Sequence, residues 1–333
     1  MSGLKILTWN VYLGADVANV INAPAAETPR RMTALLRTAE RTDFAVRSKA
    51  IAKLIARSGA DLVSLQEVYR WSTVVRRPLN EGPPEETVRW DFLPMLLDAL
   101  NAEGTTYFAA ARSNGIDVML PTTESFDVRM QDSVAILLRA GVGAPPLTWE
   151  RPQQGRFRAN LLATLGGDPF VISRGWCSVD LRGAGEALRV INTHIEFYDA
   201  NVQPAQVTEL LEGPASTAPR VILTGDFNCR PETPAWNRLV RQHGFTDAWT
   251  AGSGDGMTSS RDADLRGGTL YERIDWILCG DGIDVSDANL VGVEEDDRIG
   301  GMWPSDHAGV LATVIAAPFR SARRTDARAP DRP

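Results

Sequence analysis

Cysteine is scarce in this sequence, with 3 in 333 residues, and this scarcity excludes a small fold held together by disulfide bonds. Cys177, Cys229 and Cys279 cannot all pair within one chain, and each lies in or beside an apolar, strand-like run. Such positions are typical of reduced thiols that pack as small hydrophobic side chains. We therefore expect three free cysteines in the core.

The sequence also lacks any apolar run that approaches the roughly 18 residues needed to cross a membrane. Its first residues, MSGLKILTWN, contain no charged segment followed by a long apolar segment, so we expect no secretory signal. These absences predict a cytoplasmic protein without a transmembrane segment. The sequence does not specify an oligomer, and a monomer is the favoured expectation.

An excess of positive charge is missing as well, because 35 Lys and Arg against 42 Asp and Glu give a net charge of −7. A positive field is what recruits nucleic acid or anionic membranes without specificity. The charge balance therefore weighs against a non-specific nuclease, although a local basic groove would remain compatible with it. The pairs Arg30–Arg31 and Arg76–Arg77 are interpreted as solvated, since acids interleave with them and no aromatic ladder accompanies them.

The hydrophobic content of 44% and charged content of 23% are those of an ordinary globular protein. We expect one domain over residues 1–317 and a disordered tail over 318–333, which has no apolar period. Loops are expected over 72–86 and over about twenty residues between 111 and 133. Helices are expected at 44–58, 91–100, 202–211 and 233–243, and strands at 4–11, 61–68, 107–111, 133–139, 189–196, 221–224, 272–279 and 307–315. Many strands, few helices and short connections indicate an α/β protein with two mixed sheets packed face to face and helices outside.

Polar side chains recur where these predicted strands end or begin. The stretch VILTGDFNCRP shows this best: a buried strand leads into Gly225, which lets the backbone pass close to a neighbour, and then Asp226 and Asn228 leave on the same side. An acid and an amide placed in this way can hold a metal, a water or a phosphate oxygen, and an Asx-rich turn is the competing interpretation. The remaining members of the set are Asn10, Glu67, His194, Asp275 and Ser305–Asp306–His307.

Asp275 lies inside the apolar run RIDWIL, where an unpaired charge would be costly, so it requires a partner. His307 at the mouth of the last strand is the candidate. The chain has three histidines, and two of them, His194 and His307, fall within the polar set. The third, His243, follows a polar helix end and is given no role.

Taken together, the motifs TWN, LQE, NTH, GDFN, RID and SDH, which occur in this order between Leu4 and Ile315, resemble the endonuclease/exonuclease/phosphatase superfamily. The segments WNVYLGAD, SRGWCSVDL and TSSRDADL are similar to a bacterial branch of hydrolases within it. The resemblance implies a DNase I-like fold, a four-layer α/β sandwich of two mixed, mainly antiparallel sheets flanked by helices. It also implies a Mg²⁺-dependent phosphoesterase, with Mn²⁺ able to substitute.

The resemblance further assigns roles to residues of this chain. Glu67 would be the principal Mg²⁺ ligand, with Asn10 and Asp306 completing or supporting the coordination, because a hard cation prefers oxygen ligands. Asp226 would orient or deprotonate the attacking water, and Asn228 would hold that water or a phosphoryl oxygen.

His307, paired with Asp275, would act as general base or as a cationic stabiliser, and His194 would donate to a non-bridging oxygen. Whether Asp226 or His307 accepts the proton of water stays open.

The sequence supports three hypotheses about function. The first is hydrolysis of a phosphodiester or phosphomonoester, with a small-molecule or lipid head-group substrate slightly favoured over DNA. The alternatives are a non-catalytic family member that binds a phosphorylated ligand or partner, and a DNA or RNA nuclease. Asp16, Arg174 and Trp303 are candidates for lining the cleft, while the acidic run 294–297 is interpreted as a hydrated loop.

Overall fold

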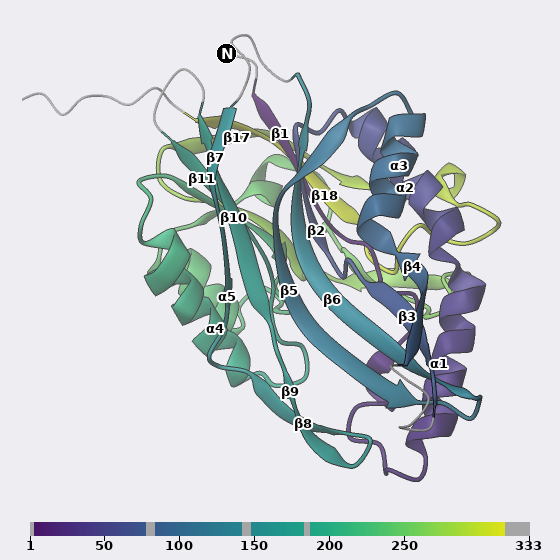
Figure 1. Cartoon of the computed structure of the whole chain (residues 1–333). Helices are drawn as coiled ribbons and strands as arrows, with labels where there is room; N and C mark the ends of the chain where they lie inside the picture. Colours follow the sequence, from purple (N-terminus) through teal and green to yellow (C-terminus); the bar gives the residue numbers. More distant parts are fainter. Residues whose placement is uncertain (1–2, 78–83, 142–147, 183–186, 317–333) are drawn as a thin grey trace, which may run out of the picture.

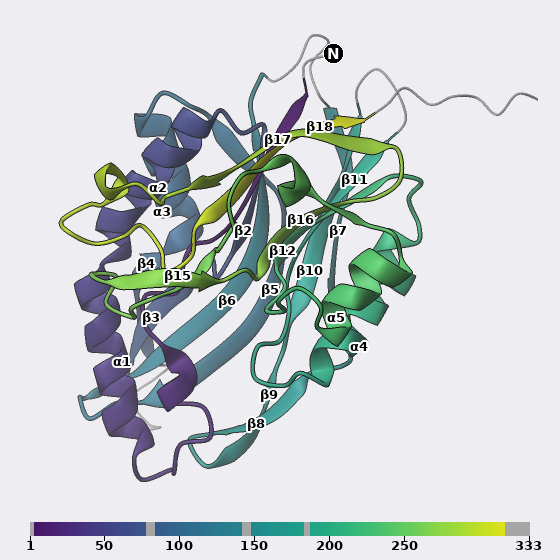
Figure 2. The same cartoon turned by 180° about the vertical axis from the view of Figure 1, so that it is seen from behind.

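A computed structural model describes residues 3–77, 84–141, 148–182 and 187–316 of the chain (Figure 1). Two large sheets pack face to face, and helices cover the outer face of each (Figures 1 and 2). The predicted α/β sandwich is therefore confirmed. The predicted tail at 318–333 lies outside the described residues, and the single-domain boundary at 317 stays a prediction.

The first sheet has eight strands and is mostly antiparallel, with β1 and β2 as its parallel pair. β5 pairs with β6 beside the main path. In spatial order the strands are β17 (Ile283–Val291), β18 (Gly309–Ala316), β1 (Leu4–Asn10), β2 (Leu62–Gln66), β6 (Phe126–Arg139), β3 (Arg70–Val75) and β4 (Glu85–Asp91), with β5 (Tyr107–Pro121) on β6.

The second sheet has six strands, and here β11 and β12 form the parallel pair. Its order is β13 (Thr246–Asp247), β16 (Asp275–Cys279), β12 (Val221–Asp226), β11 (Leu188–His194), β10 (Gly175–Arg182) and β7 (Thr148–Arg156). Two small hairpins stand apart, β8 (Leu161–Leu165) with β9 (Asp168–Ile172) and β14 (Ser259–Arg261) with β15 (Gly268–Glu272).

Side-chain alternation along the strands explains the four layers. In β1, Ile6 points to the core between the two sheets, whereas Leu7 and Trp9 pack toward the helices. In β12 the same alternation sends Ile222 to the inter-sheet core and Leu223 to the core under the other helices. The first sheet is covered by α1 (Thr28–Thr42), α2 (Phe44–Ser58) and α3 (Phe92–Ala102), and the second by α4 (Val202–Leu210) and α5 (Pro234–Asn237) (Figures 1 and 2).

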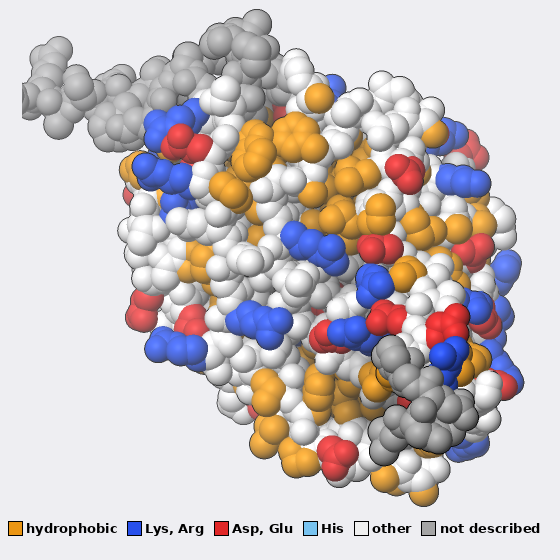
Figure 3. Space-filling model, in the orientation of Figure 1, with side chains coloured by type: hydrophobic (Ala, Val, Ile, Leu, Met, Phe, Trp, Pro, Cys, Tyr) orange, Lys and Arg blue, Asp and Glu red, His pale blue; other side chains and the backbone are white. Residues whose placement is uncertain are grey.

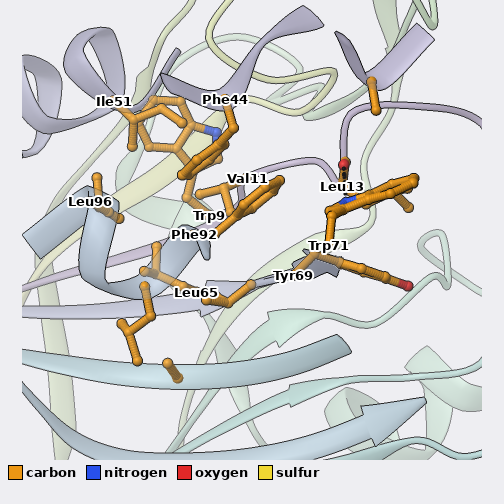
Figure 4. Close-up of a cluster of buried hydrophobic side chains, with 14 of the residues drawn as sticks. Trp9, Val11, Leu13, Phe44, Ile51, Leu65, Tyr69, Trp71, Phe92 and Leu96 are labelled. Atoms are coloured by element: carbon orange, nitrogen blue, oxygen red, sulfur yellow. Dashed lines mark hydrogen bonds between the residues drawn. The ribbon is translucent and has the colours of Figure 1, made fainter. Parts of the chain in front are cut away.

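Aromatic packing fixes α2 and α3 against the first sheet (Figure 4). The rings of Phe44 and Phe92 stack with their centroids 3.6 Å apart. Trp71 donates its indole N–H to the carbonyl of Leu13 at 3.1 Å, which ties the segment after β1 to β3. The loop that follows β1 is thus held by core side chains.

Polar side chains also cross between the two sheets. Gln66 donates to the amide oxygen of Asn192 at 2.6 Å, and Thr224 donates to the hydroxyl of Ser64 at 2.8 Å. Because all four residues are fully buried, these bonds fix how the two sheets align.

Two predicted loops are wrong. Residues 72–75 and 85–86 belong to the paired strands β3 and β4, and the segment between 111 and 133 is mostly the continuation of β5 and β6 as a long hairpin. Register shifts between Ala109 and Ala111 and between Asn114 and Asp117 break the alternation that would have revealed the strand. The strand β17 is not predicted by the sequence either, because its Asp, Asn and Ser residues have low strand propensity.

Smaller differences occur elsewhere. The predicted strand 272–279 divides between β15 and β16, the strand predicted from 307 begins at Gly309, and the second half of the helix predicted at 233–243 is π-helical. The acidic run 294–297 forms a 3₁₀ turn with a capping box in which Asp297 is buried. The three cysteines are free and buried, as expected. Within the described ranges, no helix combines the length and apolarity that a membrane span requires.

Candidate active site

Sheet topology brings the predicted polar residues to one edge of the sandwich. β1 and β2 run parallel and end at Asn10 and Gln66, with Glu67 next in the chain. β11 and β12 end together, with His194 opposite Asp226 in the register. The antiparallel strand β16 begins at this same edge, because Asp275 is opposite Asp226. Likewise β18 starts beside the end of β1, which places the Ser305–Asp306–His307 segment there.

These ends surround a cleft of about 480 Å³. Six of the eight predicted site residues line it: Glu67, His194, Asp226, Asn228, Asp306 and His307. The other two lie directly behind, since Asn10 and Asp275 are 1% and 2% exposed and contact Asp226 and His307 respectively. The glutamate of LQE and the histidine of SDH thus share one cleft.

His307 and Asp275 form a buried hydrogen-bonded pair, with Nδ1 and Oδ2 2.8 Å apart. The other ring nitrogen, Nε2, lies 3.2 Å from the hydroxyl of Ser259. Burial by itself would lower the pKa of His307, but the nearby charges of Asp275, Asp306 and Asp226 outweigh it and raise the pKa well above its ordinary value. The geometry and the charges therefore favour an imidazolium at this position.

Asp226 lies at the centre of the set. Its Oδ2 accepts from the side-chain amide of Asn10 at 3.0 Å and is 3.5 Å from Nε2 of His194 and 3.9 Å from Nε2 of His307. Its Oδ1 accepts from the backbone N–H of Asn228 at 2.9 Å. Burial, together with the charge of Asp275, raises the pKa of Asp226 to about 7. Asp226 is therefore suited to exchange a proton near neutral pH.

Arg174 and Asp226 together favour one tautomer of His194. The guanidinium Nη1 lies 3.2 Å from Nδ1 and 3.5 Å from Nε2 of His194, and because an arginine can only donate, the nearer Nδ1 is assigned as its acceptor. Burial and the charge of Arg174 lower the pKa of His194 well below its ordinary value, so the ring is neutral and carries its proton on Nε2. That N–H points toward Asp226, in keeping with the donor role predicted for this histidine.

Glu67 and Asp306 are half-buried carboxylates on the other side of the cleft. Oε2 of Glu67 accepts from the backbone N–H of Leu13 at 2.7 Å, and the residue adopts a strained positive φ of 55°. Burial raises the pKa of Glu67. Burial and the charge of Glu67 raise the pKa of Asp306 to about 6, although His307 and Arg47 act in the opposite direction. Because the charge of Glu67 disfavours the charge of Asp306, the two carboxylates form a natural site for a cation.

A second group of residues in the same cleft has ligand atoms close enough together to bind a metal ion. Asp226, Asp275 and His307 each offer a ligand atom, and these atoms all lie within 4.8 Å of one another. A metal site at this group is therefore sterically allowed, while the identity of the metal follows from neither set of residues alone.

Backbone contacts from buried side chains fix the segments that carry the site. The guanidinium of Arg47 is completely buried and donates to the carbonyls of Val11, Tyr12 and Pro304 at 2.8 to 2.9 Å. Ser305 donates to the carbonyl of Asn10 at 2.6 Å. These bonds tie the loop after β1 to the Ser305–Asp306–His307 segment, almost 300 positions away in the sequence.

Gly225 shows the close approach predicted from the sequence. Its φ is +147°, and a Cβ at this position would lie 2.1 Å from the carbonyl oxygen of Thr193 on β11. A side chain here would push β11 and β12 apart at the point where His194 and Asp226 emerge.

Other residues of the site were not predicted from the sequence. Ser259 contacts His307, and Asp132 and Glu196 flank Arg174 at 3.8 Å. Glu196 lies two residues after NTH and Ser259 lies within TSSRDADL, but neither segment by itself marks these residues as part of the site. Asp132 belongs to none of the motifs. Asp16 and Arg174 line the cleft as expected. Trp303 does not line it, because its ring is covered by Arg261 and Arg298 at 3.9 and 4.4 Å.

A sequence profile of the Endonuclease/Exonuclease/phosphatase family matches residues 7–307, and the chain belongs to this family. A comparison by sequence with curated proteins gives no match.

Solved structures of similar fold include a mannosyl-6-phosphatase from Bacteroides thetaiotaomicron, with 16% identity, a TM-score of 0.57, and coverage of 94% of this chain and 99% of that one. A family protein from Leptotrichia buccalis has 17% identity, a TM-score of 0.56, and coverage of 94% and 99%. TDP2 from D. rerio, complexed with a single-strand DNA product, has 17% identity, a TM-score of 0.54, and coverage of 95% and 100%. At these identities the likeness establishes the DNase I-like fold.

Proposed function

We propose that this protein is a Mg²⁺-dependent phosphoesterase that hydrolyses a P–O bond by in-line attack of water. The observation that carries the proposal is the hydrogen-bonded pair of His307 and Asp275, 2.8 Å apart, beside Asp226 in the cleft that also contains Glu67. A module that merely binds a phosphate has no need of a His–Asp pair next to clustered carboxylates. Phosphoric ester hydrolysis is also the chemistry of the family to which the chain belongs.

The carboxylates of Glu67 and Asp306 fit a hard divalent cation, and we assign Mg²⁺ to them, with Asn10 in support. Both are partly accessible from the cleft, and the raised pKa of each, caused first by burial, reflects the cost of burying negative charge that a cation would offset. The group of Asp226, Asp275 and His307 is less suited, because Asp275 is 2% exposed and already bonded to His307. When bound, Mg²⁺ supplies Lewis-acid activation of a phosphoryl oxygen, and Mn²⁺ is expected to substitute.

The protein's own groups divide the proton chemistry between them. Asp226, with a pKa raised to about 7 by burial, is the candidate to accept the proton of water. His307, kept cationic by its surrounding carboxylates, faces the developing negative charge, and neutral His194 donates from Nε2. Asn228, whose backbone N–H holds Oδ1 of Asp226, fixes the orientation of that carboxylate.

The charges around the cleft favour a small-molecule or lipid head-group ester over DNA. The acids Asp16, Asp262 and Glu272 line the cleft with the arginines Arg174 and Arg261. Arg261 is occupied, since it donates to backbone carbonyls and covers Trp303. On the side of β5, β6 and β10, which is the face shown in Figure 3, Lys, Arg, Asp and Glu side chains are likewise interspersed. A nuclease remains the alternative, since TDP2 with its DNA product shares the fold.

Hydrolysis of p-nitrophenyl phosphate and bis-p-nitrophenyl phosphate tests the proposal directly. We expect turnover with Mg²⁺ or Mn²⁺ and none with EDTA. Glu67→Gln is expected to reduce turnover on the order of 10³-fold at fixed Mg²⁺ and to raise the Mg²⁺ concentration needed for half-maximal rate. Asp275→Asn is expected to leave that Mg²⁺ requirement unchanged, because Asp275 is not assigned to the metal.

Glu103→Gln is the matched control, since Glu103 is exposed at the end of α3, away from the cleft. A metal-independent rate, or a wild-type rate in Glu67→Gln, contradicts the assignment. Binding of phosphate without turnover of either ester would instead support the non-catalytic alternative.

A further inference from the structure

A second cavity, which is apolar, adjoins the cleft of the candidate active site. It has a volume of about 40 Å³, and among the described residues that line it Tyr69 alone carries a polar side-chain atom. A site of this size could hold water, since one molecule needs about 10–15 Å³, but ordered water also requires two to four polar partners. The cavity therefore favours an apolar occupant over water.

The cavity and the cleft share one wall. Val17, Ile21, Tyr69, Ile116 and Ile172 line both. Tyr69 is two residues beyond Glu67, and its backbone N–H donates to the carbonyl of Glu67 at 2.9 Å. The apolar wall thus begins beside the carboxylates assigned to the metal.

The walls of the cavity are fixed by hydrogen bonds between segments far apart in the sequence. One wall follows the 3₁₀ turn Val17–Asn19, one is the β5–β6 hairpin with Val118, and one is the β8–β9 hairpin. Asn22 donates its backbone N–H to the carbonyl of Thr164 at 2.8 Å and accepts from the backbone N–H of Thr164 at 2.8 Å. This pair of hydrogen bonds joins the loop that follows the 3₁₀ turn to the β8–β9 hairpin, and so connects two walls of the cavity. Figures 1 and 2 show β8 and β9 at the end of the molecule opposite the N-terminus.

We infer that this cavity is the specificity pocket for an apolar group of the substrate, so that the preferred ester joins a phosphate to a short aliphatic substituent. The inference rests on the proposed function, because it places the phosphate at Glu67 and the substituent past Tyr69. An apolar group that enters the cavity leaves water and fills space that would otherwise be void. A purely polar ester, such as a sugar phosphate, gains no binding affinity from this apolar cavity.

Ethyl, butyl and hexyl esters of 4-nitrophenyl phosphate test the inference with a constant leaving group. We expect kcat/KM with Mg²⁺ to rise by up to about fourfold for each methylene that enters the cavity, equivalent to about 0.8 kcal/mol, and then to level off. Equal kcat/KM values for the three esters would overturn the inference.

Substitutions of Val118, which lines the cavity but not the cleft, locate the effect. Val118→Phe fills the cavity and is expected to bring the hexyl ester to the level of the ethyl ester, and Val118→Ala enlarges it and extends the gain to longer chains. Met119→Ala is the matched control, since Met119 is the next residue of β5 and is 53% exposed. A chain-length gain that persists in Val118→Phe would place the effect elsewhere and overturn the inference.

Binding of ethyl-, butyl- and hexylphosphonate in the presence of Mg²⁺, measured by calorimetry, provides a readout without turnover, because the P–C bond is not an ester. Affinity that rises with chain length, and that Val118→Phe abolishes, supports the pocket even if no ester is hydrolysed. In that case the proposed function fails while the inference stands. If all the esters are hydrolysed but the affinity for the phosphonates does not depend on chain length, the proposed function stands and the inference fails.

Discussion

The charge state of His307 depends on one buried contact. Asp275 is 2% exposed, and its Oδ2 lies 2.8 Å from Nδ1 of the imidazole. Because Nδ1 must carry a proton to donate to this carboxylate, the contact sets both the tautomer and the orientation of the ring. Nε2 is left to face Ser259 and the cleft.

Asp275→Asn is expected to lower kcat by about 10²-fold or more, since an amide can present an N–H to Nδ1 and stabilise the wrong tautomer. The loss of the negative charge should also lower the pKa of His307, so the limb of the pH–rate profile that reports this group should move to lower pH. The profile of kcat with p-nitrophenyl phosphate and Mg²⁺ measures both effects.

The exposed Asp284→Asn on β17 is the control for the same chemical change. Circular dichroism of both variants checks that the fold is kept. An unaltered pH–rate profile in Asp275→Asn would mean that the pair does not govern the reaction.

Residues such as Asn10, Asp226 and Asp275 could be predicted from the sequence because each interrupts or ends an apolar run, where a polar side chain needs a reason. Arg47 could not. It lies within the helical pattern of α2, where an arginine normally faces solvent, and its partners Val11 and Pro304 are 36 and 257 positions away. Its burial follows from tertiary structure alone. Ser259 lies within the TSSRDADL segment, but its place beside His307 depends on the β14–β15 hairpin.

At the scale of elements, the contact between β11 and β12 determines whether His194 and Asp226 meet. Gly225 permits that contact. Its positive φ, and the 2.1 Å that would separate a Cβ on this residue from the Thr193 carbonyl oxygen, are two independent penalties for any other amino acid.

Gly225→Ala is expected to lower the free energy of unfolding by roughly 2–5 kcal/mol, from the strained backbone and the steric overlap together. Gly104→Ala is the matched control, because Gly104 also has a positive φ of 75° but no heavy atom within 4 Å of its Cβ position. Gly104→Ala should lower the free energy of unfolding by only about 1–3 kcal/mol. Urea denaturation measures both, and equal losses would show that the close approach to Thr193 is unimportant.

The strands near the cleft illustrate which elements the sequence could and could not reveal. β1, β11 and β12 are fully buried at their carboxyl ends and appear as apolar runs. β5 extends into a hairpin whose exposed face carries Asp117, paired with Arg129 of β6 at 2.7 Å. The polar residues and bulges of β5 give its sequence the pattern of a loop. Its pairing with β6 is a tertiary contact that the sequence of β5 alone does not indicate. The hairpin matters for function, because its apolar side forms a wall of the second cavity.

At the scale of the whole molecule, the fold buries several carboxyl groups at one edge of the sandwich, and this burial makes the free energy of unfolding depend on pH. Burial is the main cause that raises the pKa of Glu67, of Asp226 from 3.8 to about 7, and of Asp306 from 3.8 to about 6. The folded, metal-free protein therefore binds more protons than the unfolded chain between these values. The stability from these groups is fully present below the unfolded pKa and is lost as pH rises through the folded pKa.

We expect the melting temperature of the protein in EDTA to fall by several degrees between about pH 5 and about pH 8, and Mg²⁺ to restore more stability at the higher pH. His194 acts in the opposite direction, because its lowered pKa adds stability as pH rises toward 6.5. The wild type is therefore compared with Asp226→Asn, which keeps His194. The melting temperature of this variant should fall less steeply with pH than that of the wild type. Asp98→Asn, at an exposed position on α3, should keep the wild-type slope. If Asp226→Asn declined as steeply as the wild type, Asp226 would already be ionised in the folded protein below neutral pH, and its role as the proton acceptor near pH 7 would be lost.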